Sequence, residues 1–202
     1  MPPVTTWLIR HGESLANAGH PTVGNAEVGL TELGLQQSQD VAAQMMVRPD
    51  RLVVSPFLRA QAMAAEIEER WLGLRREVLP IQELTYLSPA RCNGTTHETR
   101  QVMVRSYWER CDPDYKDGED AESFTAFMAR LHSFHEELQR EDVPFFVAVG
   151  HGQFFSAYLF ALNNSFIASP EQMKAYRLAE TANPLRNGEI LRLASGRLVG
   201  ER

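Results

Sequence analysis

Short apolar runs alternate along this chain with longer segments in which apolar residues recur every three or four positions. The short runs are rich in β-branched and aromatic residues and end at Gly, Pro or polar residues, a pattern typical of buried strands. They predict strands at residues 6–9, 52–55, 78–81 and 145–149. The segments with helical spacing predict helices at about residues 31–46, 57–71, 119–140 and 153–162.

Several boundaries carry their own signals. Thr31 is placed to cap the first of these helices, with Glu32 in its first turn. Residues 163–179 read as a connection with one helical turn after Pro170. Residues 189–193 and 196–199 predict a terminal hairpin.

The alternation of strands and helices predicts an α/β fold. We expect a three-layer α/β/α sandwich with a mostly parallel central sheet and helices on both faces. Residues 84–118 break the pattern, since they are rich in Pro, Gly, Asn and Asp around one helical piece near residues 98–110. Such a stretch is typical of a functional insertion. We therefore expect one domain over residues 1–202, with residues 84–118 as a lid over the substrate.

The composition narrows the possible functions. The chain has 202 residues, of which 44% are hydrophobic and 23% charged, as in ordinary globular proteins. Its net charge of −6 argues against a nucleic-acid partner. Cys92 and Cys111 show no metal-binding spacing, and a reducing, cytoplasmic location is the simplest expectation. No signal peptide or membrane span is evident in the sequence.

Ionisable side chains follow three of the predicted strands. Arg10 and His11 follow the first, Arg59 lies just beyond the second, and His151 follows the fourth. Because the carboxyl ends of parallel strands meet at one edge of a sheet, we expect these side chains to converge. Gly12 would let a ligand approach the backbone closely, because it has no Cβ.

Each of these residues also has a purely structural explanation. The Arg10–His11 pair suits a solvated strand end, and His151 suits a packed histidine bonded to backbone. Arg59 stands in the first turn of a predicted helix, where the dipole disfavours a cation by about 0.3–1 kcal/mol. A bound anion would offset that cost, and so would a side chain that bends into solvent. The other histidines, in loops or beside an apolar stripe, carry no clear signal: His20, His97, His132 and His135.

Several motifs together resemble one family over nearly the whole chain. They are Leu8-Ile9-Arg10-His11-Gly12-Glu13-Ser14 with Asn17, Leu30-Thr31-Glu32-Leu33-Gly34, Ser55-Pro56-Phe57-Leu58-Arg59-Ala60, Glu83, and Val149-Gly150-His151-Gly152. The chain is similar in these motifs to the histidine phosphatase superfamily, in its phosphoglycerate mutase-like branch.

The resemblance implies a mechanism and roles for most of these residues. His11 would attack the phosphorus of a small phosphorylated metabolite and become a phosphohistidine. Arg10, Arg59 and His151 would bind the transferring phosphoryl oxygens. Glu83 would protonate the leaving oxygen, with Glu13 as the competing carboxylate.

Further expectations concern the bound phosphate and the partners. The resemblance implies a phosphate hydrogen bond from Asn17 and places Gly12, Glu13 and Gly152 among the substrate-binding residues. It implies no metal and no cofactor, since arginines and histidines supply the positive charge. The sequence is compatible with a homodimer and does not decide it.

Two alternatives to a phosphomonoester hydrolase stay open at this point. A mutase would return the phosphoryl group to its substrate, but the Glu-Arg-x-Tyr-Gly segment of such mutases is replaced here by residues 84–89. A catalytically idle protein that binds a phosphorylated ligand is the second alternative. The natural substrate and the inward-facing member among Arg91, Arg100 and Arg105 are not readable from the sequence.

Overall fold

The computed structural model describes residues 5–21, 24–194 and 196–199. Its strands and helices alternate in the order β1 (Thr5–Arg10), α1 (Glu32–Gln44), β2 (Arg51–Val54), α2 (Leu58–Arg70), β3 (Arg76–Val78), α3 (Pro89–Cys92), α4 (Gln101–Arg110), α5 (Phe124–Arg140), β4 (Phe145–Gly150), α6 (Gly152–Asn163), α7 (Pro170–Ala182), β5 (Ile190–Ala194) and β6 (Arg197–Leu198). This is the α/β fold that the alternating pattern predicts.

In the described part of the chain the strands form one mixed sheet with the order β3-β2-β4-β1-β5-β6. The pairs β1–β4, β2–β4 and β2–β3 are parallel. The pairs β1–β5 and β5–β6 are antiparallel, and β5 and β6 form the terminal hairpin that the sequence predicts. Ser195, also part of the predicted hairpin, is outside the described residues.

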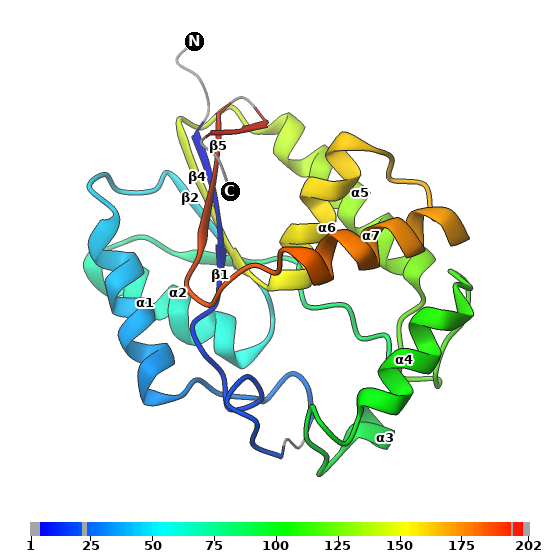
Figure 1. Cartoon of the computed structure of the whole chain (residues 1–202). Coiled ribbons are helices and arrows are strands. Elements are labelled where there is room, and N and C mark those ends of the chain that lie inside the picture. Colours follow the sequence, from blue (N-terminus) through cyan, green and yellow to red (C-terminus); the bar gives the residue numbers. More distant parts are fainter. Residues whose placement is uncertain (1–4, 22–23, 195, 200–202) are drawn as a thin grey trace.

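Helices cover both faces of this sheet, and Figure 1 shows it edge-on between them. Alternate strand residues face opposite layers. Leu8, Val53 and Ala148 pack in the cluster that contains α5, α6 and α7. Ile9 and Val147 pack in the cluster that contains α1 and α2. The three-layer arrangement is therefore confirmed.

Two predicted elements were placed wrongly. The third strand is Arg76–Val78 and not residues 78–81, because the chain leaves the sheet at Leu79 and the N–H of Ile81 bonds to the Leu79 carbonyl. Pro80 has no N–H to continue a ladder. Instead of one helical turn within a connection at residues 163–179, the chain forms a helix of 13 residues, Pro170–Ala182. This helix buries only Met173 and Tyr176, so it shows little apolar periodicity.

Candidate active site

The candidate site lies at the carboxyl ends of β1, β2 and β4. The register pairs Arg10 with Gly150 and Val54 with Val149, so these strands end at the same edge. The structure brings His11, Arg59 and His151 together there, and the rings of the two histidines lie 5.1 Å apart. Both imidazoles are buried.

His11 has a defined proton arrangement. Its Nδ1 lies 2.6 Å from the carbonyl oxygen of Gly12, and its Nε2 accepts a hydrogen bond from Arg59 Nε at 3.1 Å. A carbonyl can only accept, so the ring proton belongs on Nδ1 and the lone pair on Nε2. Burial, followed by the charge of Arg59, holds the pKa of His11 well below its ordinary value. The group is a neutral imidazole whose Nε2 lone pair faces an arginine.

Arg59 lies in the first turn of α2, but it neither bends into solvent nor stands free. Its Nη1 donates to the carbonyl of Asn25 at 2.7 Å, and its guanidinium lies over the Phe57 ring. Burial lowers the pKa of Arg59 to about 10, so the group stays charged at neutral pH. A buried cation of this kind suits an anionic ligand.

The Arg10 side chain lies between the Leu185 carbonyl and Gly152. Its Nη1 donates to the carbonyl of Leu185, while its buried Nε has no partner among the described residues. A Cβ on Gly152 would lie 3.2 Å from the Cδ and Nε of Arg10. Gly152 therefore leaves the room that the Arg10 side chain occupies, and the unpartnered Nε–H is a donor that a ligand can use.

His151 occupies the N-cap position of α6 and is fully buried. Its Nε2 lies 2.7 Å from Ser55 Oγ, which also accepts from the N–H of Phe57. Its Nδ1 has no partner among the described residues. Burial and the charge of Arg59 hold the pKa of His151 well below its ordinary value. The imidazole thus leaves one ring nitrogen without a partner in the described part of the chain.

The two candidate carboxylates have different surroundings. Glu83 lines the site cavity, and its Oε1 accepts from the backbone N–H of Gln153 at 2.9 Å. Burial raises the pKa of Glu83, against the charges of Arg59 and Arg10. Glu13 turns instead to the N-cap of α1, where its Oε1 accepts from Thr31 Oγ1 at 2.9 Å.

The glycine that follows His11 lies very close to the backbone at the start of α1. A Cβ on Gly12 would lie 2.2 Å from the carbonyl oxygen of Gly34, and a Cβ on Gly34 would lie 2.0 Å from that of Glu13. The close approach is therefore between the loop after β1 and the start of α1.

The loop around Asn17 is tied to a residue that the sequence reading missed. Asn17 Oδ1 accepts from Ser14 Oγ at 2.9 Å and from Asn187 Nδ2 at 3.0 Å. Asn187 Nδ2 also reaches the carbonyls of His11 and Gly12. The Asn187-Gly188 pair was a readable turn signal, since Gly188 has φ +73°. This turn fixes the backbone around His11.

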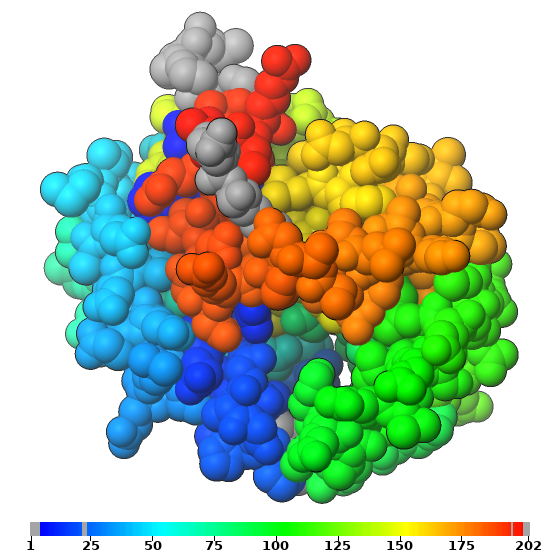
Figure 2. All heavy atoms as spheres, viewed as in Figure 1, coloured from blue at the N-terminus to red at the C-terminus, as the bar shows by residue number. Residues whose placement is uncertain are grey.

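A cavity of about 380 Å³ opens beside these groups. Figure 2 shows this face of the molecule hollowed where the segment after β1, the α3–α4 region and α7 meet. Arg10, His11, Arg59 and Glu83 line the cavity. Apolar side chains form much of the remaining wall: Leu84, Tyr86, Leu87, Pro89, Cys92, Val104, Pro184 and Leu185.

The charged residues at the rim are few. Arg100 lines the cavity, and its Nε donates to the carbonyl of Thr96. Glu180 also lines it and pairs with Arg177 at 2.7 Å. Arg91 is paired with Asp117. Arg105 lines a separate hollow between α4 and α7. Of the three arginines left open by the sequence, Arg100 is the one that the structure places on the cavity.

Within residues 5–21, 24–194 and 196–199, no group of three or more His, Cys, Asp or Glu side chains could hold a metal ion. Among the same residues, no helix is both long and apolar enough to cross a membrane.

The fold and a neutral histidine beside arginines at the strand ends together define a class of protein. Comparisons with known proteins identify this class. The family model of the histidine phosphatase superfamily (branch 1) matches residues 6–183, and the chain belongs to this superfamily. It is 28% identical over 138 residues to the adenosylcobalamin/alpha-ribazole phosphatase of Salmonella typhimurium. The alignment spans 65% of this chain and 65% of that relative.

Solved structures share the fold. A mycobacterial glucosyl-3-phosphoglycerate phosphatase in complex with VO3 has a TM-score of 0.72 at 24% identity, covering 97% of each chain. The phosphoserine phosphatase of Entamoeba histolytica in complex with 3-phosphoglyceric acid has a TM-score of 0.71 at 21% identity, covering 97% of this chain and 94% of that one. The alpha-ribazole phosphatase of Shigella flexneri has a TM-score of 0.70 at 23% identity, covering 94% and 89%.

Proposed function

We propose that this protein is a phosphomonoester hydrolase that works through a phosphohistidine at His11. The observation that carries the proposal is the state of His11. Its Nε2 lone pair, in a neutral and buried ring, accepts a hydrogen bond from Arg59 Nε at 3.1 Å, and a phosphoryl group bound by Arg59 would take the place of that bond. A nucleophile thus lies directly beside a cation that can bind the phosphoryl group, as covalent phosphoryl transfer requires.

The first half-reaction forms the phosphoenzyme. His11 Nε2 attacks the phosphorus while Arg10, Arg59 and His151 hold the equatorial oxygens. Glu83, whose pKa burial raises, gives its proton to the leaving oxygen as the P–O bond breaks. Glu13 is the weaker candidate for this role, because its carboxylate is engaged at the cap of α1.

The second half-reaction releases phosphate. The Glu83 carboxylate takes a proton from a water molecule, whose oxygen attacks phosphorus and breaks the P–N bond to His11. Glu83 is then protonated again and His11 is neutral again. The two arginines supply the positive charge, so the proposal includes no metal or cofactor.

The walls of the cavity define the substrate that we propose. Asn17 and Gly152 lie beside the phosphoryl-binding groups, and residues 84–118 form a lid that contributes Leu87, Cys92 and Val104 to the wall. A leaving group with an apolar or ring-shaped body fits this wall better than one with a second phosphate. The names of the similar proteins support the broader class, since they describe small phosphorylated metabolites.

We also propose a cytoplasmic location, which is supported by Cys92 and Cys111 being free thiols. A homodimer is compatible with the structure, and light scattering would decide it.

The test is phosphate release by the purified protein, with nitrophenyl phosphate and phosphoglycerate as probes and a metal chelator present. We expect release from nitrophenyl phosphate that His11→Asn abolishes and that the exposed-histidine control His132→Asn retains. Isomerisation of phosphoglycerate faster than phosphate release would favour a mutase. Phosphate binding without turnover would favour an idle binding protein. Undiminished hydrolysis by His11→Asn would refute the proposal.

A further inference from the structure

The backbone that carries Glu83 has no regular structure. Residues 79–88, between β3 and α3, belong to no helix and no strand. No ladder of backbone hydrogen bonds fixes them, so the position of the Glu83 carboxyl depends on contacts made by other segments. One such contact is its own bond from the Gln153 N–H.

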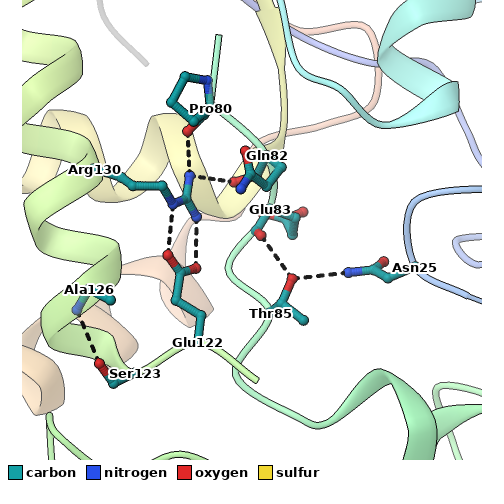
Figure 3. Close-up of polar contacts among 9 residues, drawn as sticks. All are labelled: Asn25, Pro80, Gln82, Glu83, Thr85, Glu122, Ser123, Ala126 and Arg130. Carbon is teal, nitrogen blue, oxygen red and sulfur yellow. Dashed lines mark hydrogen bonds and ion pairs between the residues drawn. The ribbon is translucent and has the colours of Figure 1, made fainter. Parts of the chain in front are cut away.

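Arg130, on α5, provides a second anchor just before Glu83. Its Nη1 donates to the carbonyl of Pro80 at 2.7 Å and to that of Gln82 at 3.1 Å (Figure 3). Its guanidinium also lies over the rings of Phe127 and Phe154, at 5.3 and 5.4 Å. These contacts fix the guanidinium, so the carbonyls of Pro80 and Gln82 face a donor with a defined position.

Glu122 completes this arrangement. Its two carboxylate oxygens accept from Nε and Nη2 of Arg130 at 2.7 and 2.8 Å, a bidentate pair that Figure 3 shows face to face. The side chains are only 15% and 18% exposed. The backbone N–H of Glu122 donates to the carbonyl of Thr85 at 2.8 Å. The Arg130–Glu122 pair therefore forms hydrogen bonds with the backbone both before and after Glu83.

We propose that Arg130 and Glu122 are positioning residues that hold Glu83 where it can protonate the leaving oxygen. This inference rests on the proposed function, in which Glu83 is the general acid. Arg130 itself stays away from the substrate, since its Nε, Nη1 and Nη2 are engaged by Glu122, Pro80 and Gln82. A planar fork with fixed donors suits this task in a way that the point charge of lysine does not.

The test compares phosphate esters with good and poor leaving groups. Dinitrophenolate leaves without help, whereas phenolate, with a pKa of about 10, needs a proton. Glu83→Gln should therefore lower kcat/KM for phenyl phosphate about 100-fold or more and for dinitrophenyl phosphate only a few-fold. Arg130→Gln should show the same selectivity at a smaller size, about 10-fold against less than about 3-fold.

Matched variants separate positioning from general stability. Arg51→Gln removes an arginine that pairs with Glu77, Glu137 and Glu141 at the opposite end of β2, and it should lower both activities equally if at all. Arg130→Lys and Glu122→Gln are milder and remain informative if Arg130→Gln does not fold. In a Glu83→Gln background, the Arg130 change should add no further leaving-group dependence.

The outcomes distinguish this inference from the function beneath it. Equal losses on both esters in all Arg130 and Glu122 variants, with Glu83→Gln still selective, would overturn the positioning role alone. Equal losses in Glu83→Gln would remove Glu83 as the general acid and the positioning role with it. Neither result bears on His11, whose own variant tests the phosphohistidine.

Discussion

The two buried histidines predict how stability depends on pH. His11 and His151 both have pKa values held well below the ordinary value of 6.5, chiefly by burial. The unfolded chain therefore binds protons at a pH where the folded chain does not. Stability must fall as pH falls through about 6.5, and the loss continues until the depressed folded-state pKa is reached.

The magnitude follows from linkage. A histidine that stays neutral in the folded state costs about 1.4 kcal/mol of stability between about pH 7.5 and about pH 5.5. His11 and His151 together cost about 2.7 kcal/mol over this interval. Glu83 works in the opposite direction, because its pKa is raised by burial. It is common to the wild-type protein and the histidine variants, so its contribution largely cancels in their difference.

The assay is urea unfolding at these two pH values in buffer without phosphate, followed by circular dichroism. We compare the wild-type protein with His11→Gln, His151→Gln and the double variant. Each single variant should lose about 1.4 kcal/mol less than wild type on acidification, and the double variant about 2.7 kcal/mol less. The same acid-induced loss in wild type and double variant would refute the claim that these rings are buried as neutral groups.

Three further substitutions test separate parts of the structure. Gly12→Ala would place a Cβ 2.2 Å from the Gly34 carbonyl, and since backbone cannot swing aside, we expect a loss of about 3 kcal/mol in urea unfolding; a loss under about 1 kcal/mol would contradict the close approach. Glu13→Gln should cost at most about 1 kcal/mol at the Thr31 cap and show no leaving-group-dependent loss of kcat/KM, whereas such a loss would return Glu13 to the acid role. Phe154→Ala, at a fully buried ring, should cost about 3–5 kcal/mol, and thermal unfolding unchanged by it would contradict the packing described.

Much of the fold could be predicted because the strongest signals are local. β4 is buried along its whole length and reads as an unbroken apolar run. α5 buries five residues at helical spacing, although it begins at Phe124 after the Ser123 cap and not at residue 119. β3 and α7 could not be placed correctly, because an edge strand and a helix with two buried residues leave little pattern. Their positions depend on tertiary contacts.

The candidate site, too, could be predicted only in part from the sequence. Arg10, His11 and His151 lie directly at strand ends, so topology alone predicts that they meet. The contacts that surround them depend on segments far away in sequence, such as the Arg59 bond to the His11 ring and the Asn187 bond to the His11 carbonyl. The Arg130 contacts to residues 80–82 were likewise invisible in the sequence, since backbone carbonyls carry no residue signature.

The central claim is a covalent phosphohistidine at His11, and trapping it is the most direct measurement. The protein is mixed with a labelled aryl phosphate, quenched in base, which preserves phosphohistidine, and digested for peptide mapping. We predict label on the peptide that contains His11 and none in His11→Asn. Turnover of the ester with no label on that peptide, under a quench shown to preserve phosphohistidine, would contradict the account.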